Sequence, residues 1–210
     1  MIKAIVFDMD GVLIEAKDWH YEALNKALAL FGYHINRYDH LTTFDGLPTS
    51  KKLEMLSIES GLPKGLHKFI NEMKQAYTME IVHAQCRPIF IHEFALSNLK
   101  AMGYKLAVAS NSIRNSVEVM MQKARLEGYL DLMLSASDVK YPKPDPSIYI
   151  TSIERLGLTA DECLIVEDNE NGIKAALGSG AHLLKVTSVY EVNLDRILSR
   201  VEAINAGRVK

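Results

Sequence analysis

Cysteine is scarce in this sequence, which has two cysteines in 210 residues. Cys86 and Cys163 lie far apart along the chain, so a disulfide framework is not expected. Cys163 falls in the apolar run of residues 163–166, where a buried free thiol behaves as a small hydrophobic side chain. This cysteine usage predicts a protein of a reducing compartment, and we expect a cytoplasmic one.

Long apolar runs and an excess of one charge are also lacking. No run approaches the roughly 20 residues that a membrane-spanning helix needs, and Asp8 interrupts the N-terminal apolar residues too early for a signal peptide. The net charge of −2 and the pI near 6.4 provide no basic surface for nucleic acid. Neither a membrane nor a nucleic acid is therefore an expected partner.

Hydrophobic residues make up 48% of the chain, enough for a full core and a small second domain. Short apolar runs typical of strands lie at residues 2–7, 105–109, 132–134, 163–166 and 182–186. Helical patterns follow at residues 93–102, 115–126, 146–156 and 170–179, with a last one from residue 192. Strands that alternate with helices predict an α/β core with a Rossmann-like, doubly wound parallel sheet.

One segment breaks this alternation. Residues 15–85 show helical periodicity and almost no strand signal, and the stretches 18–31 and 66–82 are amphipathic at helical spacing. A helical block between the first and second strands predicts an inserted cap domain over the tip of the first strand. We therefore expect an α/β core of residues 1–14 and 86–210 and a helical cap of residues 15–85.

Two carboxylates at the end of the first apolar run are the most informative feature. Asp8 and Asp10 are two residues apart, so their side chains point the same way off the pleat, at the strand end where open α/β sheets build their sites. Such a pair is kept when a cation or a shared proton offsets its repulsion. The two acids fit a nucleophile and a proton donor beside magnesium, and a solvated turn is the alternative.

Two further motifs carry groups that suit a phosphate. Ser110, Asn111 and Ser112 follow the strand at residues 105–109, where a hydroxyl and backbone amides can cradle phosphate oxygens; the alternative is a helix cap by Ser110 or Ser112. Lys143 lies among three prolines in five residues, which fix where its ammonium points. That ammonium can stabilise charge in a transition state, and a rigid surface turn is the alternative.

A fourth motif again places acids after a buried strand. Glu167 and Asp168 follow residues 163–166 and offer the oxygen ligands that magnesium prefers. The alternative is that Asp168 or Asn169 caps the helix that begins at Glu170. A cap at Asp168 would not require the second acid at Glu167.

These four motifs, in this order and spacing, resemble those of the haloacid dehalogenase-like hydrolase superfamily. The matching residues are Asp8-Met9-Asp10-Gly11-Val12, Ser110-Asn111, Lys143-Pro144-Asp145-Pro146 and Glu167-Asp168. The resemblance covers most of the chain, and the helical block resembles the cap of the phosphoglycolate phosphatase and β-phosphoglucomutase group. Each motif alone is weak, but four in order, each after a strand, are specific.

The resemblance implies a role for each acid. Asp8 matches the nucleophile that attacks phosphorus and forms an aspartyl-phosphate. Asp10 matches the general acid that protonates the leaving oxygen and then, as a base, activates water. The backbone carbonyl of Asp10 also matches a metal ligand. Asp168, with Glu167 as a ligand or as a carboxylate behind the ligands, matches the magnesium anchor, so the implied cofactor is Mg²⁺.

The same resemblance gives roles to the polar motif residues. Ser110 and the amide of Asn111 match the donors to the phosphate oxygens, and Lys143 matches the charge stabiliser. An acid at position 10 separates branches of the superfamily, because dehalogenases and phosphonatases lack it and P-type ATPases carry threonine there. Asp10 therefore points to hydrolysis or transfer of a phosphate ester.

The helical block also contains candidate substrate contacts. His20 lies where the β-phosphoglucomutase-like group carries a histidine at the cap hinge, with ordinary packing as the alternative. Residues 44–52 resemble the group's substrate-specificity loop. The candidates in this block are His20, Gly46, Thr49, Lys51 and Lys52.

A second phosphate site would distinguish a mutase from a phosphatase. The mutases carry an arginine shortly after the loop glycine, and here Thr49 stands in its place. Lys51 or Lys52 could replace that arginine, but lysine is a poorer bidentate phosphate ligand, and both also fit solvated helix positions. Because a mutase must hold a bisphosphate at both ends, the sequence favours a phosphatase.

The sequence thus predicts a cytoplasmic, monomeric, Mg²⁺-dependent phosphatase. Its expected partner is a small phosphorylated metabolite, such as a sugar phosphate, hydrolysed through an aspartyl-phosphate. A β-phosphoglucomutase-like phosphosugar mutase is the first alternative. A non-catalytic binding protein on the same fold is the second, and the acids retained at all four positions argue against it.

Overall fold

The computed structural model describes residues 1–44 and 46–208. The chain divides into two compact units, Met1–Glu15 with Arg87–Lys210 and Ala16–Cys86. Asp45 of the predicted substrate loop and the last two residues of the expected core lie outside the described residues. Each unit is considered by itself below.

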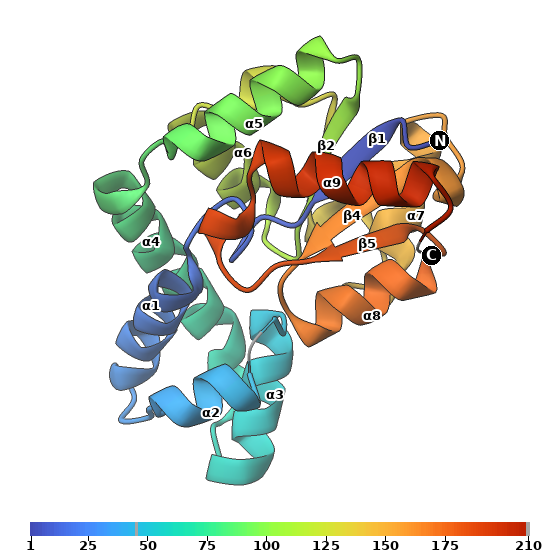
Figure 1. Cartoon of the computed structure of the whole chain (residues 1–210). Helices are drawn as coiled ribbons and strands as arrows, with labels where there is room; N and C mark the ends of the chain where they lie inside the picture. The colour runs from blue at the N-terminus through green and yellow to red at the C-terminus, as the bar shows by residue number, and fades with distance from the viewer. Residues whose placement is uncertain (45, 209–210) are drawn as a thin grey trace. The chain divides into compact units, whose positions relative to one another are not determined.

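The first unit is built on a parallel sheet of five strands in the order β3-β2-β1-β4-β5 (Figure 1). The strands are β1 (Ala4–Phe7), β2 (Lys105–Ala109), β3 (Leu132–Leu134), β4 (Cys163–Glu167) and β5 (His182–Lys185). Phe7 at the end of β1 is level with Val108 of β2 and Val166 of β4. The predicted Rossmann-like parallel sheet is confirmed, and the residues that follow β1, β2 and β4 begin at one edge.

Helices cover both faces of this sheet. They are α5 (Phe90–Ala101), α6 (Arg114–Lys123), α7 (Ser147–Arg155), α8 (Glu170–Gly178) and α9 (Leu194–Asn205). Ala4 and Val6 pack in one cluster with Tyr149 of α7 and Ala175 of α8. α5 and α9 contact each other over the opposite face (Figure 1). Every residue of β1 is buried because both of its faces are covered, as parallel sheets require.

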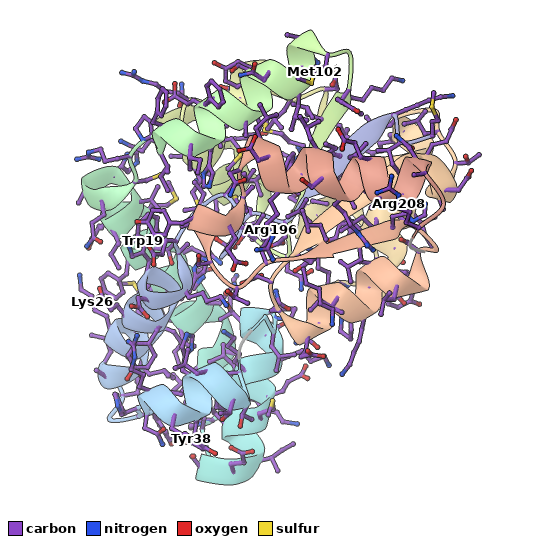
Figure 2. All side chains as sticks on the ribbon, viewed as in Figure 1. Trp19, Lys26, Tyr38, Met102, Arg196 and Arg208 are labelled. Carbon is purple, nitrogen blue, oxygen red and sulfur yellow. The ribbon has the colours of Figure 1, made fainter. Side chains whose placement is uncertain are left out.

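Short 3₁₀ turns and polar contacts complete this unit. The turns are η2 (Glu127–Tyr129), η3 (Ala136–Asp138), η4 (Ala160–Glu162) and η5 (Val189–Glu191). Arg196, labelled in Figure 2, projects from α9 and donates a hydrogen bond of 3.1 Å to the carbonyl oxygen of Lys185. Cys163 is buried as a free thiol, as expected, and burial raises its pKa to about 11.

The secondary structure of the second unit is helical, with short loops between the helices of its described residues. It contains α1 (Lys17–Ala29), α2 (Arg37–Thr42), α3 (Thr49–Ser60), η1 (Lys64–Leu66) and α4 (His67–Gln85). Leu28, Leu53 and Ile70 contribute to its hydrophobic core. Lys26, labelled in Figure 2, crosses from α1 to α4, where its Nζ lies 2.9 Å from an oxygen of Glu80.

Two helices end two or three residues earlier than predicted, and both differences have a conformational cause. The helix expected over residues 115–126 ends at Lys123, since Arg125 adopts a left-handed conformation with φ 59°. The helix expected over residues 18–31 ends at Ala29, shortly before Gly32 with φ 77°. Among the described residues, we find no helix that combines the length and apolarity needed to cross a membrane.

Candidate functional site

A buried ion cluster lies where β1, β4 and the proline-rich loop meet. The Nζ of Lys143 is 2.6 Å from Oδ1 of Asp8 and 2.8 Å from Oε1 of Glu167. Asp8, Lys143 and Glu167 are 5%, 3% and 0% exposed. Removing Lys143 would leave two buried carboxylates without their compensating charge, which costs several kcal/mol (~3–5). The cluster therefore depends on Lys143.

Lys143 is held at both its ammonium and its backbone. Its Nζ also lies 2.8 Å from the carbonyl oxygen of Ala109 and 2.8 Å from the hydroxyl oxygen of Tyr149, so its three N–H protons are shared among four acceptors. Its backbone N–H donates to Oδ1 of Asn111 at 3.0 Å, and the Asn111 side chain donates to its carbonyl oxygen at 3.2 Å. Asn111 thus ties the loop to the end of β2 through its side chain, a role that the sequence did not predict.

Both carboxylate oxygens of Glu167 accept hydrogen bonds. Its Oε1 accepts from the hydroxyl of Tyr149 at 2.6 Å as well as from Lys143, and its Oε2 accepts from the backbone N–H of Asp168 at 3.0 Å. The carboxylate lies against Gly172 in the first turn of α8, where a Cβ atom would overlap it. These contacts suit Glu167 to hold Lys143 in position.

Burial and charge set the protonation of this cluster. Burial raises the pKa of Asp8 well above its usual range, while Lys143 acts in the opposite direction. Burial alone would lower the pKa of Lys143, but the carboxylates of Asp8 and Glu167 more than offset this and raise it. Burial and the same carboxylates raise the pKa of Tyr149 well above its usual range. Lys143 is accordingly a cation, and Tyr149 a neutral donor.

Three carboxylates of the cluster are placed to share a cation. Asp8, Glu167 and Asp168 each offer an oxygen, and these oxygens lie within 4.8 Å of one another. When ionised they carry three negative charges against the single positive charge of Lys143, and hard oxygen ligands suit Mg²⁺ or Ca²⁺. The donor set therefore fits a divalent cation. The carboxylate of Asp10 is not in this group.

Asp10 lies in a tight turn directly after β1. The backbone N–H of Gly11 donates to the carbonyl oxygen of Ile14 at 2.7 Å, and Ile14 N–H donates back to Met9 at 2.9 Å. Gly11 has φ 96°, a conformation that glycine adopts without strain. Oδ2 of Asp10 accepts a hydrogen bond of 2.8 Å from the hydroxyl of Ser112. The turn and this hydrogen bond together fix where the second acid points.

Of the alternatives that treated these polar residues as helix caps, those at Ser110, Ser112 and Asp168 are not observed, whereas the one at Asn169 is. Ile113 precedes α6 and makes no side-chain cap. The hydroxyl of Ser110 instead accepts from the backbone N–H of Ser112 at 3.0 Å. Asn169 caps α8 by accepting from the N–H of Gly172 at 3.0 Å, so Asp168 is not the cap. The predicted core residues of all four motifs are therefore brought together at the same edge of the sheet.

The candidate substrate residues of the helical unit are placed within that unit alone. His20 of α1 lies with its Nδ1 3.1 Å from Nζ of Lys74 on α4, and Lys74 is buried. Gly46 has φ 68° in the turn before α3, and Thr49 begins that helix. Lys52, also on α3, is buried.

Lys51 behaves as a surface helix residue. Its Nζ lies 2.8 Å from Oε2 of Glu54 three residues on, and both side chains are more than half exposed. The Lys51 ammonium lowers the pKa of Glu54. This pairing agrees with the solvated-helix alternative for Lys51.

The sequence does not predict the roles of three residues that belong to the site, Tyr149, Gly172 and Ser112. Tyr149 follows Lys143 by six residues and was counted as part of a helical pattern. Gly172 follows the acidic pair by four residues and shows no feature of its own. Ser112 was considered only as a phosphate donor or a helix cap. Their contacts join separate elements, so local sequence spacing carries little signal for them.

Comparison with known proteins gives the site a context. The family model described as haloacid dehalogenase-like hydrolase matches residues 5–186. A haloacid dehalogenase-like hydrolase domain-containing protein of Arabidopsis thaliana is 31% identical over 213 residues, covering 85% of this chain and 66% of that protein. A phosphorylated carbohydrates phosphatase of Thermotoga maritima is 27% identical over 212 residues, covering 99% of this chain and 89% of that protein.

A solved structure shows the same fold over the whole chain. The β-phosphoglucomutase of Clostridium difficile is similar with a TM-score of 0.85 and 21% identity, and the match covers 100% of each chain. At this identity the likeness concerns the fold. About a third of the Arabidopsis protein lies outside its match, which covers 66% of its length.

Replacing Gly172 by alanine tests the packing of the Glu167 carboxylate. Gly→Ala within a helix ordinarily stabilises a protein by up to about 1 kcal/mol, but here the new Cβ would overlap that carboxylate. We expect Gly172→Ala to lower the free energy of unfolding by about 1–3 kcal/mol, as overpacking does. Urea denaturation followed by circular dichroism measures this change.

Gly128→Ala is the matched control, because a Cβ there has no neighbour within 4 Å and φ is not positive. It should change the free energy of unfolding by less than about 0.5 kcal/mol. A Gly172→Ala protein as stable as the wild type would mean that Glu167 is not held against α8.

Proposed function

The chain belongs to the haloacid dehalogenase-like hydrolase family, and we propose that it is a Mg²⁺-dependent phosphatase acting through an aspartyl-phosphate on Asp8. The observation that carries this proposal is the buried Asp8 carboxylate, whose Oδ1 lies 2.6 Å from the Lys143 ammonium. A nucleophile needs one oxygen aimed at phosphorus, and a hydrogen bond to the other oxygen orients it. Its proposed substrate is a small phosphomonoester.

Asp8 begins the proposed reaction by attacking phosphorus as the bond to the leaving oxygen breaks. Little covalent chemistry is needed from the other residues, since phosphoryl transfer depends mainly on positioning and charge neutralisation. Lys143 supplies a fixed positive charge, and Ser110 supplies a hydroxyl that is 1% exposed. Because the Ser110 oxygen already accepts from Ser112 N–H, its proton can point to a phosphate oxygen.

Asp10 provides the proton transfers in this proposal. As an acid it protonates the leaving oxygen, and as a carboxylate it then takes a proton from the water that attacks the aspartyl-phosphate. Its position two residues after Asp8 places it on the same side of the strand end. The proton from Asp10 leaves with the alcohol, a proton from water restores the acid form of Asp10, and hydrolysis restores Asp8.

Magnesium would be held by Asp8, Asp168 and the backbone carbonyl of Asp10. When bound, it supplies charge neutralisation for the phosphoryl group and orients that group for attack. Support comes from the three clustered carboxylates, whose repulsion a divalent cation would offset. Glu167 stands behind these ligands, since its two oxygens already accept from Lys143, Tyr149 and Asp168.

Sugar phosphates are the substrate class that we propose. The Thermotoga maritima relative is named a phosphorylated carbohydrates phosphatase, and its match covers 99% of this chain. A phosphosugar mutase is the second candidate, because the Clostridium difficile protein of the same fold is a β-phosphoglucomutase. Thr49 in place of an arginine and the pairing of Lys51 with Glu54 favour the phosphatase.

The helical unit is the proposed cap. We propose that it closes over the substrate, excludes bulk water and selects the sugar. His20, Gly46, Thr49 and Lys52 are the residues whose contacts would set that choice. The protein is proposed to act as a monomer in the cytoplasm, where its buried free thiols would stay reduced.

Release of inorganic phosphate tests the proposed function. We expect wild-type protein to release phosphate from members of a panel of phosphomonoesters when Mg²⁺ is present and not after chelation. Asp8→Asn removes the nucleophile and should reduce kcat by at least about 10³-fold. Asp195→Asn, the same change at an exposed position on α9, should leave kcat unaltered.

Full activity in Asp8→Asn would contradict an aspartyl-phosphate mechanism. No release of phosphate from any compound of the panel would favour the mutase, which would convert hexose 1-phosphates only with a bisphosphate primer. No turnover of either kind would leave the non-catalytic alternative.

The raised pKa of Asp8 predicts how Mg²⁺ binding depends on pH. A proton stays on Asp8 at higher pH than on an ordinary aspartate, and this proton competes with the metal. The affinity for Mg²⁺ should therefore fall as the pH is lowered, beginning at a higher pH than for an ordinary aspartate, and binding should release protons in that range. Isothermal titration calorimetry in buffers of different ionisation enthalpy measures both quantities. A pH-independent affinity without proton release would contradict this prediction.

A further inference from the structure

We propose that Ser112 is a positioning residue for Asp10 and determines which oxygen of that carboxyl group carries the transferred proton. The hydroxyl of Ser112 donates a hydrogen bond of 2.8 Å to Oδ2 of Asp10, across 102 positions in the sequence. In a protonated carboxyl group the carbonyl oxygen is the stronger hydrogen-bond acceptor, so this donor on Oδ2 favours Oδ1 as the oxygen that carries the proton for the leaving group. The inference rests on the proposed function, in which Asp10 is the acid.

Asp10 needs such a partner because its backbone is fixed while its side chain can still rotate. The turn after β1 is closed by hydrogen bonds from Leu13 and Ile14 N–H to Met9, at 3.0 and 2.9 Å. A bridge joins Asp10 to Ile14 as well. Rotation about the side-chain bonds would carry the carboxyl group away from the leaving oxygen, and a misplacement of about 1 Å can cost about 10²-fold in rate.

Ser112 is itself anchored on both sides. Its backbone N–H donates to the hydroxyl oxygen of Ser110 at 3.0 Å, and its carbonyl oxygen accepts from Ala136 N–H at 3.0 Å. Ser112 does not cap α6, since that helix has no side-chain cap. These backbone hydrogen bonds fix the position of Ser112, so its hydroxyl is held against Asp10. The hydroxyl thereby links the segment after β2 to the turn after β1.

The hydrogen bond supports both halves of the proposed reaction. In the first half, an oxygen of Asp8 bonds to phosphorus, the bond to the leaving oxygen breaks, and its electron pair takes the proton from Oδ1 of Asp10. In the second half, water bonds to phosphorus, its proton passes to the Asp10 carboxylate, and the bond to Asp8 breaks. Ser112 donates to Oδ2 throughout, so Oδ1 gives up and regains the proton.

Dependence on the leaving group separates positioning of the acid from binding or folding. An alkyl alkoxide is a strong base and needs a proton to leave, whereas p-nitrophenolate leaves without one. The ratio kcat/KM reports the steps up to leaving-group release and excludes hydrolysis of the aspartyl-phosphate. Loss of the Ser112 hydroxyl should therefore affect kcat/KM for alkyl phosphates and spare p-nitrophenyl phosphate.

The experiment compares Ser112→Ala with wild type on p-nitrophenyl phosphate and on the alkyl phosphomonoester that the wild type hydrolyses fastest. We expect kcat/KM for the alkyl phosphate to fall about 10- to 100-fold, within the range that general acid catalysis contributes. The fall for p-nitrophenyl phosphate should be less than about 3-fold. Ser112→Thr keeps the hydroxyl and should recover most of the alkyl phosphate activity.

A double-mutant cycle tests whether Ser112 acts through Asp10. In an Asp10→Asn background, Ser112→Ala should cause no further fall in kcat/KM for p-nitrophenyl phosphate or for the alkyl phosphate. Thermal unfolding of each variant shows whether it is folded. If Ser112→Ala unfolds, Ser112→Cys, which retains a weaker donor, takes its place with the same expected pattern.

Equal falls for both phosphates, a change confined to KM, or additivity in the Asp10→Asn background would overturn the role of Ser112. These outcomes leave the proposed phosphatase intact. A wild-type protein that releases phosphate from neither compound, or from no alkyl phosphate of the panel, would instead contradict the proposed function itself.

Discussion

The buried ammonium of Lys143 between Asp8 and Glu167 is the interaction on which the site depends. Its Nζ has acceptors in β2, β4 and α7 and in Asp8 directly after β1, so one cation ties these parts of the fold together. A buried ion pair stabilises the fold only when its remaining lone pairs and protons also form hydrogen bonds. The parallel register of the central strands, the stiff proline loop and the space left by Gly172 all serve this matching.

The same cluster explains why the site would need a divalent cation to act on phosphate. Asp8, Glu167 and Asp168 lie together, and Lys143 supplies one compensating charge. A phosphomonoester dianion approaching these acids would meet repulsion rather than attraction. Magnesium at the acidic edge would cancel this excess of negative charge where phosphorus must be attacked. The arrangement thus separates two tasks: Lys143 orients the nucleophile, and the metal would admit the substrate.

The sequence predicted the parts of this structure that follow from strand ends. Apolar runs located the five strands, and a parallel sheet necessarily gathers residues such as Asp8, Ser110 and Glu167 at one edge. The contacts between separate elements could not be predicted from the sequence. Tyr149 lies in the site because α7 packs against β2 and β3 and the Tyr149 hydroxyl reaches Glu167 of β4, and Ser112 because two loops meet. The helix end near Arg125 was missed because a left-handed non-glycine residue leaves no mark in the sequence.

A covalent phosphoryl group on Asp8 is the central claim of this account. The most direct measurement is a single turnover with a ³²P-labelled phosphomonoester, quenched in acid, followed by mass spectrometry of the digested protein. The account predicts transient label on the peptide that contains Asp8, formed and lost at rates fast enough to support turnover, and absent from Asp8→Asn. Phosphate release at the full rate with no label on the protein would show direct attack by water and would contradict it.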